Sequence, residues 1–167
     1  TNRNLDFSKN HHLVAGLDHF INPNLKLRTE IYCQYLFDIP VEISPSGYSV
    51  INYGADYYSI IEDSLRNSGT GFNRGIEISL DRSYYKGFYH MTTISIFESK
   101  YQGSDNIWRN TLFNNNYIFN VLGGYEFKLP NNQSLAINTN LVWAGGLRFT
   151  PIDLESSMKE QQMIFHA

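Results

Sequence analysis

The feature that most constrains the fold of this chain is a recurring alternation of apolar and polar residues at a period of two. Successive side chains of a β-strand point to opposite faces of a sheet, so this period predicts strands rather than helices. A slip of one residue would exchange the two faces, and the pattern therefore also constrains strand register. In the clearest segment, 25–36, the apolar set is Leu25, Leu27, Ile31, Cys33 and Tyr35, and the polar set is Lys26, Arg28, Glu30 and Gln34.

The same alternation predicts about six strands in the whole chain. In the fourth strand the two faces are ambiguous, because Ile94 and Ile96 share a face with His90, Glu98 and Lys100. The predicted strands are His11–Phe20, 25–36, Phe72–Ser83, Phe88–Tyr101, Asn116–Leu129 and Ser134–Gly145. The residues expected on one common apolar face are Leu27, Ile31, Ile76, Ile78, Phe119, Val121, Leu135 and Leu141.

The connections between these strands alternate in length. Tight turns rich in Pro, Asn and Gly are expected near 21–24, 84–87 and 130–133. Long connections are expected near 37–71, 102–115 and 146–167. This order places all tight turns at one edge of the sheet and all long loops at the other. It predicts an all-β, antiparallel up-and-down meander, the layout of outer-membrane β-barrels with periplasmic turns and extracellular loops.

The composition narrows the class of protein further. Aromatic residues make up 15% of the 167 residues and gather near the predicted strand ends, which is typical of an interfacial girdle, although aromatic residues also favour strands in general. No segment approaches the roughly 20 apolar residues of a spanning helix. The formal net charge of −3, without a basic cluster, argues against nucleic-acid binding. A single Cys and scattered His residues give no disulfide framework and no zinc spacing.

No motif for catalysis is present, so we expect neither an enzyme nor a bound cofactor or metal. Binding residues concentrate on loops carried by a rigid scaffold, and the long loops are therefore the expected ligand contacts. Their aromatic rings could stack on a sugar, and an arginine could hold an anionic chelate. The alternative is that these side chains pack the loops together. The candidates are Tyr48, Tyr53, Tyr57 and Tyr58 in the first long loop, and Trp108 and Arg109 in the second. A short helix is also expected at 57–66.

Three segments, 69–105, 109–130 and 144–155, resemble the C-terminal barrel region of TonB-dependent outer-membrane receptors. They read GTGFNRGIEISLDRSYYKGFYHMTTISIFESKYQGSD, RNTLFNNNYIFNVLGGYEFKLP and AGGLRFTPIDLE. The resemblance implies a bacterial outer-membrane barrel of about 22 strands around a plug domain. Such a receptor imports siderophores, haem, cobalamin or oligosaccharides with energy delivered by TonB. The partners that it implies are membrane lipid, the rest of the barrel, the plug, TonB, and a small-molecule or oligosaccharide ligand.

The sequence departs from a complete receptor of this kind. Residues 1–10 are polar and unlike a signal peptide, and neither a plug nor a closing strand with a terminal aromatic residue is recognised. We therefore expect an internal piece of a barrel wall. The alternative is a soluble β-sandwich or small barrel that acts as a binding module and buries its apolar face against a second layer.

Overall fold

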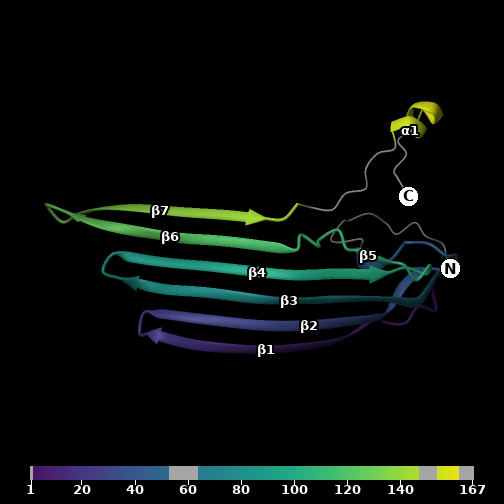
Figure 1. Cartoon of the computed structure of the whole chain (residues 1–167), viewed down its shortest axis with the longest axis horizontal. Coiled ribbons are helices and arrows are strands. Elements are labelled where there is room, and N and C mark those ends of the chain that lie inside the picture. The colour runs from purple at the N-terminus through teal and green to yellow at the C-terminus, as the bar shows by residue number, and fades with distance from the viewer. Residues whose placement is uncertain (1, 53–63, 147–153, 162–167) are drawn as a thin grey trace.

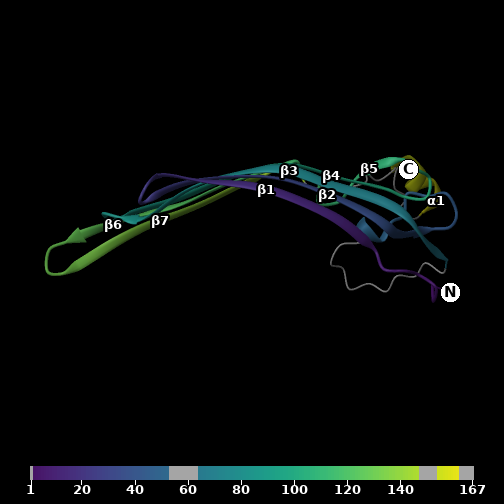
Figure 2. The ribbon, with the colours of Figure 1, turned by 90° about the horizontal axis from the view of Figure 1, so that it is seen from below.

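A computed structural model describes residues 2–52, 64–146 and 154–161. The described strands form one antiparallel sheet in the order β1-β2-β3-β4-β6-β7, and the short β5 pairs with the end of β4 (Figure 1). Seen along its edge, this sheet is a single bent layer (Figure 2). The strands are β1 (Lys9–Asn22), β2 (Leu25–Glu42), β3 (Leu65–Tyr85), β4 (Phe88–Gln102), β5 (Trp108–Asn110), β6 (Tyr117–Leu129) and β7 (Gln133–Ala144). The predicted all-β meander is confirmed.

The three tight turns lie where the sequence places them, and local chemistry explains each. The amide of Asn24 donates to Oδ1 of Asn22 at 3.0 Å, which closes the β1–β2 turn. Lys86 and Gly87 both have positive φ, as a type I′ hairpin requires. Asn131 and Asn132 take the same left-handed conformation between β6 and β7. Asparagine and glycine tolerate this region better than other residues, so these turns are encoded locally.

The first predicted long loop is wrong at both ends. It was expected at 37–71, but β2 continues to Glu42 and β3 begins at Leu65. A bulge at Asp38, with φ 55°, lets β2 bend and continue, and alternation alone does not reveal such a bulge. Leu65 and Arg66, expected in a helix, belong to β3, while 57–63 lie outside the described residues. The second loop contains β5, and the third contains the helix α1 (Leu154–Glu160).

Cross-strand pairing sorts the side chains into two faces. One face, here called the apolar face, includes an unbroken row across the six long strands. All eight residues that were expected to share a face lie on it. The row consists of Leu17, Thr29, Ile78, Ile94, Phe119 and Trp143. The opposite face, called the polar face, carries Asp18, Arg28, Glu30, Glu77, Ser95, Asn120 and Asn138, among others.

Charged residues on the apolar face of β3 and β4 lie at the borders of the apolar band. Ile78 and Ile94 face each other at the centre, and Arg74, Arg82, His90 and Glu98 each lie four positions from this pair along their own strand. The ambiguity in the fourth strand is thereby resolved, because its isoleucines occupy the middle and its polar residues the ends. Eight residues of strand span about 27 Å, which is the distance between the two charged borders along β3 or β4.

Aromatic rings follow the same two borders. At the loop end, the rings of Phe72 and Trp108 are 5.2 Å apart, and the Arg74 guanidinium lies 5.1 Å from the Phe72 ring. At the turn end, the rings of Tyr125 and Phe127 are 4.7 Å apart. On β2 to β4 the middle of the apolar face is therefore aliphatic apart from Thr29 and Thr92, and both margins are aromatic and charged. On β6 and β7 the rings of Phe119 and Trp143 continue its central row.

The apolar face has no packed layer above it within the described residues. Its aliphatic side chains are exposed, for example Leu13 at 74%, Ile96 at 57% and Leu141 at 55%. The only buried hydrophobic residues of the described chain are Ile39, Val41 and Tyr101, which lie at the loop end. The sheet therefore has a small core beneath its loops and an uncovered apolar surface along its length.

Candidate functional site

A hollow of about 490 Å³ lies on the polar face toward the loop end of the sheet. Strands β1 to β4 form its floor, and Phe113 from the segment between β5 and β6 lies at its rim. It combines two carboxylates, an imidazole, amides and two phenyl rings, which is a mixture suited to a polar ligand with some apolar surface. The lining residues are His12, Val14, Glu30, Tyr32, Gln34, Asn73, Glu77, Phe97, Ser99 and Phe113.

Two glycines shape the floor of this hollow. A Cβ atom on Gly75 would lie 2.8 Å from the hydroxyl oxygen of Tyr32, and one on Gly16 would lie 3.2 Å from Cγ of Glu30. Tyr32 therefore lies across β3 because Gly75 leaves it room. The glycines allow both larger side chains to lie against the sheet, so the hollow stays open above them.

The floor also brings two acidic residues together. Glu30 and Glu77 are direct cross-strand partners on the polar face. The nearest basic residue on the same strand, Arg28, donates to both carboxylate oxygens of Asp18 at 2.8 and 3.1 Å. The ion pairs found in the described part of the chain leave out both glutamates. Like charges directly opposite each other are destabilising, so this floor favours a cation or a group that donates hydrogen bonds.

The rim of the hollow is fixed by hydrogen bonds to the end of β4. The fully buried Asn114 accepts from the Ser99 amide at 3.1 Å and donates to Oδ1 of Asn110 at 2.8 Å. The amide of Thr111 donates to the Ser99 carbonyl at 3.1 Å. Phe113 lies between these two anchored residues. The segment is thus held over the polar face, and the phenyl ring is positioned by its neighbours.

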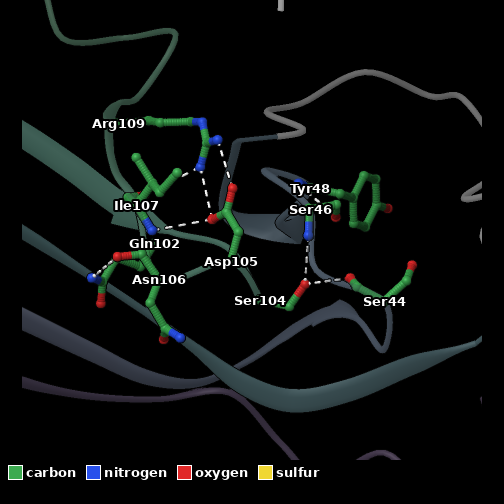
Figure 3. A network of polar contacts seen from close by, with 9 residues as sticks. All are labelled: Ser44, Ser46, Tyr48, Gln102, Ser104, Asp105, Asn106, Ile107 and Arg109. Atoms are coloured by element: carbon green, nitrogen blue, oxygen red, sulfur yellow. Dashed lines mark hydrogen bonds and ion pairs between the residues drawn. The ribbon is translucent and has the colours of Figure 1, made fainter.

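A second network joins the segments that follow β2 and β4 (Figure 3). Arg109 donates from Nη1 to Oδ1 of Asp105 at 2.9 Å and from Nη2 to Oδ2 at 2.6 Å. Ser104 Oγ accepts from the Ser46 amide at 3.0 Å and donates to the Ser44 carbonyl at 2.6 Å. The serine contacts join the two segments at the loop end, and the Arg109–Asp105 pair braces the second segment; this network is here called the clamp.

Electrostatics and close packing both support this clamp. The hydrogen bonds from Arg109 lower the pKa of the Asp105 carboxyl, and the same contact raises the pKa of Arg109. A Cβ atom on Gly47 would lie 2.8 Å from Cζ of Arg109, so a larger residue there would displace the guanidinium from this position. The clamp is a structural unit whose arginine is already occupied by a carboxylate.

The structure separates the ligand candidates predicted from the sequence. Tyr48 and Arg109 lie in the clamp, where the Tyr48 amide donates to Ser46 Oγ at 3.2 Å. Trp108 is next to Arg109 in β5 but packs on Phe72 of the apolar face. Tyr53, Tyr57 and Tyr58 lie outside the described residues. The described candidates therefore lie in two places, the clamp and the apolar face.

The residues of the hollow were not predicted as ligand contacts. The alternation assigns Glu30 and Glu77 to polar positions, but their meeting depends on the register between β2 and β3. A long segment joins these strands, so its sequence does not fix which residues face each other. Each glutamate lies at a polar position in the middle of a predicted strand. An acidic residue at such a position in two strands is the signal that could have pointed to this pair.

Comparison of the chain with known protein families, characterised proteins and solved structures found no match. Among the described residues, no helix is both long and apolar enough to cross a bilayer.

Proposed function

We propose that this chain forms part of the wall of a large bacterial outer-membrane β-barrel, in a TonB-dependent receptor that imports a scarce ligand. The observation that carries the proposal is the uncovered apolar face, which on β2 to β4 has a largely aliphatic centre and aromatic and charged margins. This is the arrangement expected where strands cross a bilayer. Lipid would contact the aliphatic centre, and the two margins would lie at the headgroups.

The energetic argument concerns the exposed aliphatic side chains. Burying one large aliphatic side chain is worth about 1.5–3 kcal/mol, and many of these side chains are exposed in the described residues. A sheet with such a face and two open edges would aggregate in water. A surrounding hydrocarbon phase removes this difficulty, since it replaces water over the whole face.

The stagger of the hairpins supports a barrel larger than this sheet. The β1–β2 hairpin ends level with Arg82, and β3 continues past this point to Tyr85. Likewise, the β3–β4 hairpin ends near the pair Phe88 and Tyr125, and β6 continues past this point to Leu129. Figure 1 shows the β6–β7 hairpin reaching furthest. If all turns lie at one membrane surface, a shift of nearly two residues per strand gives a tilt of roughly 50°, close to that of transmembrane barrels. The edges β1 and β7 would pair with further strands of the wall.

The polar face would then line the interior of the barrel. Anchored loop segments lie over this face, and the hollow floored by Glu30 and Glu77 lies on it. In such a receptor the plug would occupy the interior, TonB would supply the energy for import, and a small molecule or oligosaccharide would pass along the polar surface.

Site-specific fluorescence tests the membrane placement. In the full-length protein carrying Cys33→Ser, Ile78→Cys or Ser79→Cys would be labelled with an environment-sensitive dye and reconstituted in vesicles. We expect nitroxide-labelled lipid to quench the dye at position 78 but hardly at position 79, because the two side chains lie on opposite faces. Equal quenching at both positions, or recovery of the protein in water without detergent, would favour the soluble β-sandwich.

The transport role requires a separate test in cells. A strain lacking the gene would be grown with iron chelates, haem, cobalamin or oligosaccharides as the limiting nutrient, beside a strain lacking TonB. We expect both strains to fail on the same nutrient. Growth of both on every nutrient would count against import while leaving the membrane placement intact.

A further inference from the structure

We propose that the apolar face carries a binding site for a lipid with a phosphate headgroup at its loop end. The proposal builds on the membrane placement inferred above. A groove of about 520 Å³ runs over β2, β3 and β4 on this face. Ile31, Ile76 and Ile96 line its aliphatic part, and Cys33, Arg74 and Glu98 form the next row toward the loops. One end of the groove is therefore hydrocarbon, and the other end is charged.

The charges at this end leave a cationic surplus. Arg74 donates to Oε2 of Glu98 from Nε at 3.0 Å and from Nη2 at 2.6 Å, and Nζ of Lys100 lies 2.5 Å from Oε1 of the same carboxylate. Two cations thus share one carboxylate. The Arg74 side chain is 63% exposed, so its guanidinium can also reach a second acceptor. A phosphate that joined this group would bring the local charge close to balance.

The aromatic neighbours complete the shape of the site. Phe72 lies beside Arg74, and Trp108 packs on Phe72 from β5. Lys100 and Phe72 are cross-strand partners in the next row. An acyl chain in the groove would lie on the isoleucines, with its phosphate at Arg74 and Lys100 beside the aromatic margin. Trp108 would then contact the headgroup end of the bound lipid, because it lies beside Phe72 on the apolar face.

The ligand class follows from the two parts of the site, the aliphatic groove and the two cations, because one molecule must contact both. A free phosphate would contact only the cations, and an uncharged diacyl lipid would contact only the groove. A phosphorylated lipid contacts both, and neither half alone should bind as tightly.

Native mass spectrometry of the full-length protein in a maltoside detergent can test this site. The probes are dioleoyl phosphatidic acid, dioleoylglycerol and inorganic phosphate, which separate the whole ligand from its two parts. We expect phosphatidic acid to bind best, and Arg74→Ala with Lys100→Ala to weaken it about tenfold or more, since two charge-assisted contacts are lost. Arg82→Ala is the matched control, because it removes an arginine from the same strand and face at the turn end.

Glu98→Gln gives a result that loss of folding cannot imitate. This variant removes the carboxylate that competes for both cations, so phosphatidic acid should bind several-fold more tightly. The proposal is overturned if the alanine pair binds phosphatidic acid like the wild type, or if Arg82→Ala loses as much affinity. It is also overturned if inorganic phosphate binds equally well. A protein that fails this test but still shows one-sided lipid quenching at position 78 retains the proposed function and loses only the lipid site.

Discussion

Replacing Ile94 with arginine provides the most direct measure of what covers the apolar face. Ile94 is paired with Ile78 at the centre of the band, four residues from His90 and from Glu98. In a transmembrane barrel an arginine at the bilayer midplane costs about 2–4 kcal/mol. This corresponds to a roughly 30- to 1000-fold shift in the folding equilibrium. On a water-exposed surface the same change would stay within about 0.5 kcal/mol.

Two control variants make this measurement specific. Ser95→Arg adds the same side chain one residue away on the polar face, where Glu77 is the cross-strand partner, so we expect almost no loss of stability. His90→Arg lies on the apolar face at its border, where the expected cost falls to about 0–1 kcal/mol. The assay is urea unfolding of the full-length protein in phospholipid vesicles, followed by tryptophan fluorescence. Equal effects of Ile94→Arg and Ser95→Arg would refute the lipid-facing assignment, and equal effects of Ile94→Arg and His90→Arg would refute the depth profile.

Three further predictions concern close packing, the acidic floor and the loop clamp. Gly124→Ala should cost about 0.5–1.5 kcal/mol in the same unfolding assay. Its Cβ would overlap Asn138 Oδ1 and lie 2.7 Å from Tyr89 Cε1, so both side chains must move and the hydrogen bond of 2.9 Å from the Tyr89 hydroxyl to Asn138 is lost. Gly146→Ala, with nothing within 4 Å, should be neutral. Glu77→Gln should stabilise the sheet by about 0.2–1 kcal/mol by removing repulsion from Glu30, and a loss of stability at low salt would contradict this. Because the pKa of Asp105 is lowered, its pairing with Arg109 should hold fully above the ordinary aspartate value of about 4 and weaken only as the pH falls through the lowered pKa. Limited proteolysis near Ile107 should therefore be slow at neutral pH and faster in Asp105→Asn, and unchanged cleavage in that variant would exclude the clamp.

The local features of this fold could be predicted from the sequence. Alternation assigned Ile78 and Glu77 to opposite faces because a strand has a period of two whatever its partners are. Asn131 and Asn132 marked a turn because their side chains tolerate positive φ. Such features depend on residues close together in the chain, so local sequence was sufficient.

Other features required contacts between residues far apart in the chain. The extension of β2 past Asp38 depends on a bulge and on pairing with β3, and β5 forms only because β4 offers it an edge. The ligand candidates Trp108 and Arg109 are adjacent in sequence, but pairing with β4 places them on opposite faces.

The sequence by itself determined the central parts of the six long strands, where the tight turns lie, and which side chains share a face there. The tertiary structure alone decided that Glu30 meets Glu77, that Phe113 lies at the rim of a hollow, and that Arg74 and Lys100 share Glu98. The physical reason is that face assignment repeats every two residues, whereas register between strands joined by long segments is fixed only when their backbones pair.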